Sequence, residues 1–171
     1  WFMYELTGSA TLLGAVGLAN GLPLLALSLY GGVIADRVPK KYVLILGQAA
    51  SAMLAIVVAL LITWSLITWQ LLLVASVVQG MIMALMMPSR QAVIAELVGG
   101  DGLTNAVALN TAGMNLNRLM APGIAGLLIA VVGIEAVYYV MTGLYAVATL
   151  FAFRLPITGA SSITGGGALE N

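Results

Sequence analysis

Long stretches without a charged side chain constrain this chain more than any other feature. They cover residues 6–35, 42–89, 102–117, 119–134 and 136–153 of the 171. A helix needs about 20 apolar residues to cross the hydrocarbon core of a bilayer, whereas a surface helix of a soluble domain carries charges on its outer face. The pattern therefore predicts helices that cross a membrane.

Five complete spans fit these stretches. The second stretch is long enough for two spans, divided at residues 63–68, and the third and fourth form one span interrupted by Arg118. We predict an all-α fold, a polytopic membrane helix bundle, with spans near residues 10–34, 42–62, 69–87, 105–132 and 136–153. The segment before the first span carries Glu5 and no basic residue, which disfavours a signal peptide. No strand-like alternation of a membrane barrel is present.

The amino-acid composition argues against several classes of function. Only 7% of the residues are charged, against about 25% in a typical soluble domain. Six basic residues balance six acidic ones, so no basic excess exists for binding nucleic acid. The absence of Cys and His excludes disulfides and Cys/His zinc sites. We therefore expect no cofactor and no metal. An enzyme is disfavoured because the spans hold no pair of carboxylates.

The basic residues predict an orientation. Five of the six fall on one side of the predicted bundle: Arg37, Lys40, Lys41, Arg90 and Arg154. The positive-inside rule makes that side cytoplasmic. The loops at residues 36–41 and 88–102 and the C-terminal tail then face the cytoplasm, as expected for a multi-pass protein of the bacterial inner membrane.

The same orientation places the N-terminus outside. We interpret Trp1–Leu6 as the end of an earlier span, so that residues 1–156 form the N-terminal transmembrane bundle. Residues 157–171 are rich in Gly and Ser and predict the start of a flexible cytoplasmic linker.

The most specific motif lies between the first two complete spans. It reads Gly32-Val33-Ile34-Ala35-Asp36-Arg37, with Lys40 and Lys41 shortly after, and it resembles the loop signature of the major facilitator superfamily. Residues 87–98 and 103–110 resemble the region between the fourth and fifth spans of a bacterial exporter branch that includes enterobactin-type siderophore exporters. The resemblance covers the chain to about Pro156. It implies the N-terminal six-helix half of a twelve-span transporter, with its first helix truncated and the C-terminal half as its partner.

Four positions depart from the family pattern, one of them being Ala121, which stands where the antiporter motif has Gly before its Pro. Pro39 stands where the loop usually has Gly, Ser76 stands where a fourth-span motif has Arg, and Ala125 precedes Gly126 where the antiporter motif has two glycines. The Arg-based proton step is therefore unsupported here. No complete predicted span contains Asp or Glu, so a carboxylate that couples transport to protons is expected outside them.

The loop motif predicts a conformational gate. Its expected members are Gly32, Asp36, Arg37, Lys40, Lys41 and Arg90. An ion pair that forms in one conformation only, for example between Asp36 and Arg90, biases a two-state equilibrium. For the lysines, the alternative is that they only anchor the loop on the cytoplasmic side.

Four polar residues predict a substrate pathway: Gln79, Asn110, Asn117 and Arg118. Arg118 lies about 20 Å into its span at 1.5 Å per residue, and a central Arg costs about 2.5–3.5 kcal/mol on insertion scales. Such residues usually face a bundle interior or a wet cavity. The alternative is that these groups only join helices by hydrogen bonds.

Small residues predict close helix packing. Gly17 and Gly21 form a GxxxG pattern, and Pro122 and Gly126 lie in the fifth span. Taken together, the resemblance implies a secondary active transporter that exports small amphiphilic molecules, of the drug or siderophore class, by proton-coupled alternating access. A non-transporting membrane scaffold or regulatory fragment is the alternative.

Overall fold

The structure is a computed structural model that describes residues 2–37 and 39–154, without the side chains of residues 28–37, 96, 97 and 99–101. The predicted linker at residues 157–171 lies outside the described residues. Every regular element described is an α-helix: α1 Phe2–Thr7, α2 Ala10–Arg37, α3 Lys40–Thr63, α4 Trp69–Val131 and α5 Ile134–Phe153. The predicted all-α fold is confirmed.

Side-chain caps and turn residues set several helix boundaries. The Ser9 hydroxyl accepts a hydrogen bond from the backbone N–H of Leu12 at 3.3 Å, directly before α2. The Thr68 hydroxyl does the same for Leu71 at 3.4 Å, at the start of α4. These bonds satisfy N–H groups that the first turn of a helix leaves without partners. Gly133, with a φ of 110°, separates α4 from α5 in a conformation that only glycine adopts easily.

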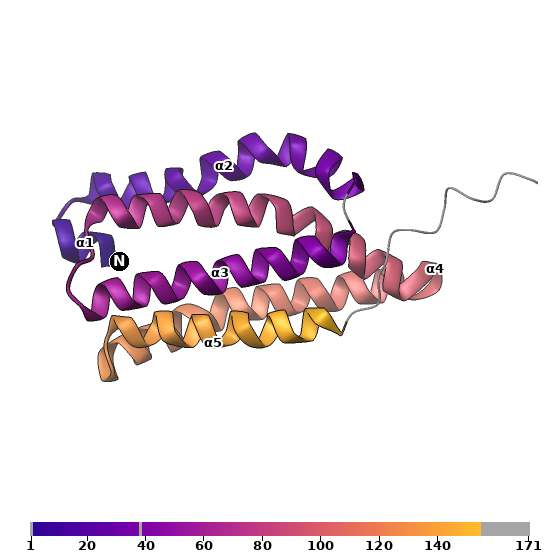
Figure 1. Cartoon of the computed structure of the whole chain (residues 1–171). Coiled ribbons are helices and arrows are strands. Elements are labelled where there is room, and N and C mark those ends of the chain that lie inside the picture. The colour runs from indigo at the N-terminus through magenta and orange to yellow at the C-terminus, as the bar shows by residue number, and fades with distance from the viewer. Residues whose placement is uncertain (1, 38, 155–171) are drawn as a thin grey trace, which may run out of the picture.

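α4 contains two membrane spans because the chain reverses direction within it. We call Trp69–Ala95 the first arm and Gly102–Val131 the second arm, after the two segments long and apolar enough to cross a membrane. Arg90 Nη2 donates to Asn110 Oδ1 at 3.2 Å. In a straight helix, 20 residues would separate their backbones by about 30 Å. The bond therefore requires the reversal, which Figure 1 shows at the right-hand end of the bundle, beside the label of α4.

The connection between the arms corrects one expectation. We expected a loop at residues 88–102, but the structure is helical throughout that segment. Pro88 lies in this segment, and proline lacks the N–H of an interior helix position. Here α4 continues past it, as proline is tolerated in membrane bundles.

Five segments of the described chain are long and apolar enough to cross a membrane, the number that the sequence predicted. They are Ala10–Leu27, Lys40–Thr63, Trp69–Ala95, Gly102–Val131 and Ile134–Phe153. Many of their large apolar side chains are exposed, including Leu25, Leu46 and Leu127. Exposed apolar side chains along a span are suited to lipid tails rather than to water.

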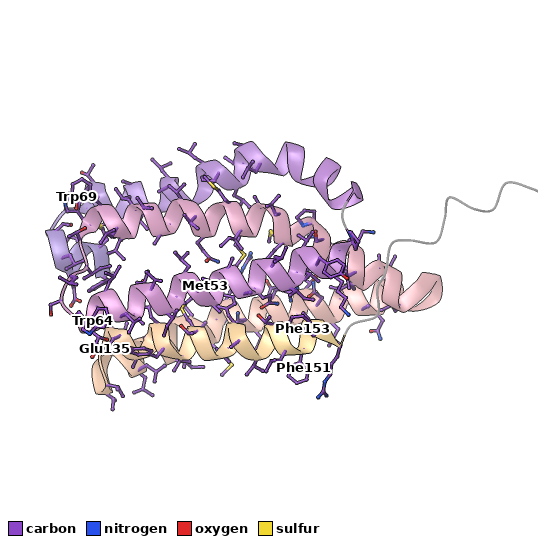
Figure 2. All side chains as sticks on the ribbon, viewed as in Figure 1. Met53, Trp64, Trp69, Glu135, Phe151 and Phe153 are labelled. Carbon is purple, nitrogen blue, oxygen red and sulfur yellow. The ribbon has the colours of Figure 1, made fainter. Side chains whose placement is uncertain are left out.

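The helices pack in two groups. α2 lies along the first arm of α4, and α3 lies along α5 with the second arm beside them (Figure 1). Small buried clusters join the groups: Met3, Val58 and Leu72 form one, and Leu44, Met86 and Val93 form the other. Trp64, Trp69 and Glu135 lie at one end of the bundle, and Phe151 and Phe153 lie toward the other (Figure 2).

Candidate functional site: a polar cavity inside the bundle

A cavity of about 370 Å³ lies where α2, α3, the first arm of α4 and α5 meet. Its walls are mainly apolar, with uncharged polar groups contributed by all four helices. The lining residues are Asn20, Ser51, Leu54, Ala55, Val58, Leu72, Ala75, Ser76, Gln79, Met83, Tyr138, Met141 and Tyr145. Apolar walls with a few placed hydrogen-bonding groups are the usual form of a small-molecule site.

Gln79 is the centre of the polar lining. Its Nε2 donates to the Ser51 hydroxyl of α3 at 3.4 Å, and its side chain is hydrogen-bonded to Tyr145 of α5. Ser51 is 1% exposed, so the bond to Gln79 satisfies a group removed from water and lipid. The amide therefore connects three helices while it borders the cavity.

The opposite wall is fixed by a close contact between α2 and α4. The Asn20 side chain donates to the backbone carbonyl of Ser76 at 3.3 Å. One turn further along α4, a Cβ on Gly80 would collide with the Asn20 carbonyl oxygen. The absent side chain at Gly80 thus lets the two backbones approach, which brings the Asn20 amide to the cavity edge.

A second cavity, of about 530 Å³, lies between α3, the second arm of α4 and α5. Its polar groups come from Gln48, Asn117 and Tyr145. Met141 and Tyr145 line both cavities, so these two side chains of α5 form the wall between them. The two cavities are therefore neighbours.

The four predicted pathway residues do not gather at one point. Gln79 lines the first cavity, Asn117 lines the second, and Asn110 binds Arg90. Arg118 is exposed and is not among the lining residues of either cavity. A shared role for the four in transport stays a prediction.

The loop motif is described only in part. The side chains of Asp36 and Arg37 and the surroundings of Gly32 lie outside the described part of the chain, and so does the expected pairing of Asp36. Lys41 Nζ donates to the carbonyl of Phe153 at 2.8 Å, at the end of α5. A cation at a helix C-terminus satisfies a free carbonyl and matches the helix dipole. Lys41 therefore joins the start of α3 to the end of α5. Its role as a gate residue or as a topological anchor stays a prediction.

Close helix contacts occur at glycines that the GxxxG pattern does not include. A Cβ on Gly17, Gly21 or Gly126 would meet no described atom within 4 Å beyond its own helix turn. A Cβ on Gly47 would instead collide with the Met86 side chain, as one on Gly80 would with Asn20. The packing role predicted for the first three residues is not seen among the described helices.

Sequence reasoning missed most of the cavity lining. Asn20, Ser51, Ser76 and Tyr145 are each a polar residue within an otherwise apolar span. That signal was available, because polar groups inside membrane spans usually face a bundle interior. In the described part of the chain, no group of three or more His, Cys, Asp or Glu side chains could hold a metal ion.

Comparison with known proteins assigns the family. Residues 1–158 match the family model described as transmembrane secretion effector, MFS_3. The chain is 28% identical to the staphyloferrin A transporter of Staphylococcus aureus, over 91% of this chain and 39% of that protein. It is 26% identical to the uncharacterized MFS-type transporter YfiS of Bacillus subtilis, over 90% and 36% of the two chains.

A third relative is the multidrug efflux pump Tap of Mycolicibacterium fortuitum, 27% identical over 95% of this chain and 41% of Tap. The chain thus spans about two fifths of the length of these relatives. No solved structure matches it. Because the family model covers most of the chain and the five candidate spans agree with it, the protein is a multi-pass membrane protein that belongs to the transmembrane secretion effector family of major facilitator superfamily transporters.

Proposed function

We propose that this chain is the N-terminal six-helix part of a secondary transporter that exports small amphiphilic molecules across the bacterial cytoplasmic membrane. Transport proceeds by alternating access between this bundle and a second six-helix unit, and proton entry drives it as an antiport. The loop that contains Asp36 and Arg37 and the segment at residues 88–102 face the cytoplasm in this proposal.

The first cavity carries the proposal. It is a space of about 370 Å³ inside an apolar bundle, bordered by the amides of Asn20 and Gln79 and by tyrosine hydroxyls. A ligand that enters it meets apolar walls and uncharged hydrogen-bonding groups together, which suits an amphiphile. Two relatives, the staphyloferrin A transporter and the multidrug efflux pump Tap, support an organic substrate of the siderophore or drug class.

The test is an efflux assay on the full-length gene product that contains this chain. It is produced in bacteria that lack their own drug exporters, and the accumulation of ethidium is followed with and without a protonophore. We expect low accumulation that rises when the protonophore is added. We also expect Gln79→Leu to raise accumulation at an unchanged protein level, because the amide that borders the cavity is lost.

Two results would contradict the proposal. Equal accumulation in cells with and without the protein, for ethidium and for a panel of organic anions, would favour the non-transporting scaffold. Efflux that continues unchanged when the protonophore collapses the gradient would reject proton coupling while leaving export in place.

A further inference from the structure

Arg118 lies near the middle of a membrane span. The second arm runs over Gly102–Val131, so Arg118 is 16 residues from its start and 13 from its end. At 1.5 Å per residue, these distances are about 24 Å and about 20 Å. A bilayer core is about 30 Å thick, so a span centred in it holds Arg118 close to the midplane. An arginine side chain is too short to reach the headgroups from there.

The surroundings of Arg118 within the described chain supply no compensating charge. Its side chain is exposed, and the next residue, Leu119, is 80% exposed. The acidic side chains that the structure describes are Glu5, on α1, and Glu135, at the bundle end where α5 begins (Figure 2). By sequence, Glu96 and Asp101 fall between the two arms, outside both spans.

An exposed guanidinium at this depth needs a partner. Facing lipid tails it would keep its full desolvation cost, and arginine cannot lose its proton to avoid it. The guanidinium is also the cation best shaped for bidentate binding of a carboxylate. We infer that Arg118 is an anion-binding residue that pairs within the membrane with a carboxylate-class anion beyond the described residues.

Two sources could present that anion. One is the substrate, which rests on the proposed function and makes the exported molecules anionic. The other is an acidic side chain elsewhere in the longer protein, consistent with relatives about two and a half times the length of this chain. The second source does not depend on transport.

The experiment measures the thermal unfolding of the purified full-length protein in detergent, with citrate as a carboxylate probe. Sodium chloride at matched ionic strength and glucose are the controls. Arg118→Gln removes the charge, Arg118→Lys keeps it, and Arg154→Gln removes a charge from the end of α5 as a matched control. Selection for second-site mutations that restore Arg118→Gln runs in parallel.

The expected result for a substrate anion is a rise in unfolding temperature with citrate that Arg118→Gln abolishes and Arg154→Gln retains. For an acidic side chain of the protein, Arg118→Gln lowers the unfolding temperature without ligand, and neutralising one Asp or Glu elsewhere restores it. If Arg118→Gln does not accumulate, normal accumulation of Arg118→Lys shows that the charge is required, which supports this second source.

The inference is overturned if Arg118→Gln matches the wild type in both unfolding temperature and response to citrate. It is also overturned if neither Arg118→Gln nor Arg118→Lys accumulates and no neutralised Asp or Glu elsewhere restores Arg118→Gln. Since unfolding is measured without transport, a failure of the proposed function is seen separately, in the efflux assay.

Discussion

The two arms of α4 belong to one continuous helix, yet they have opposite environments. In the first arm 22% of the residues are buried, whereas in the second arm none is. The first arm packs Leu72, Ala84 and Met86 against its neighbours and approaches the backbone of α2 at Gly80. The second arm exposes Asn117 and Arg118 near its middle.

This difference shows that exposure alone does not identify a lipid-facing surface. A helix that faces lipid exposes apolar side chains, whereas a helix that faces a partner or a wet cavity exposes polar ones. By that criterion, the Asn117–Arg118 region of the second arm is suited to contact with protein, water or substrate. The first arm already has its partner in α2.

The largest effect that tests this comparison is expected from glycine-to-alanine variants in the two arms. Gly80→Ala places a methyl group against the Asn20 carbonyl oxygen, and overpacking of this kind costs about 1–3 kcal/mol. Gly113→Ala meets no described atom within 4 Å beyond its own helix turn, and alanine favours a helix by up to about 1 kcal/mol. Thermal unfolding of the full-length protein in detergent measures both.

We expect the two variants to move the unfolding temperature in opposite directions. Equal destabilisation by both would mean that the second arm is as tightly packed in the full-length protein as the first. The difference in packing between the two arms would then hold for this stretch of chain but not for the full-length protein.

A smaller effect is expected from removing one amide in each arm. Gln79→Leu loses the bonds to Ser51 and Tyr145, and interhelical hydrogen bonds in membranes average about 0.6 kcal/mol, with a maximum of about 1.7. Asn117→Leu removes an exposed amide, so we expect its unfolding free energy to change by less than about 0.5 kcal/mol. A double-mutant cycle with Ser51→Ala isolates the free energy of the hydrogen bond between Gln79 and Ser51. A coupling energy of zero would show that this bond adds nothing to the stability of the protein.

An effect of similar size is expected at the contact between the arms. Arg90 and Asn110 are joined by one hydrogen bond of 3.2 Å at an exposed position, and a typical hydrogen bond contributes about 0.5–1.5 kcal/mol. Arg90→Gln and Asn110→Ala should each destabilise by that amount, and the double variant by no more than either alone. Fully additive losses would mean that each residue acts through a different contact.

The number of spans and the helical class could be predicted because the thickness of the bilayer core sets the length of a charge-free stretch that spans it. The continuity of α4 could not, since Pro88 and the charges near it usually mark a loop. The contacts between helices were harder to predict than the helices themselves. Gly17 and Gly21 have the familiar spacing, but Gly80 makes the contact, because spacing does not tell which face of a helix meets a neighbour.

For the candidate site, the sequence predicted Gln79 and missed its partners. Gln79 is conspicuous as an amide inside a long apolar run, whereas Ser51 and Tyr145 are residue types that spans often contain at many positions. Only the packing of α3 and α5 around α4 shows that these two side chains meet Gln79. Long-range contacts of this kind are decided by helix orientation, which periodicity in one span does not fix.

The reversal within α4 also bears on how the protein enters the membrane during synthesis. Two spans joined by only residues 96–101 are suited to entering the bilayer as one helical hairpin. The apolar first arm then favours insertion of the pair and offsets the unfavourable transfer of Arg118. The first arm can in this way assist the insertion of a span that carries a charged residue.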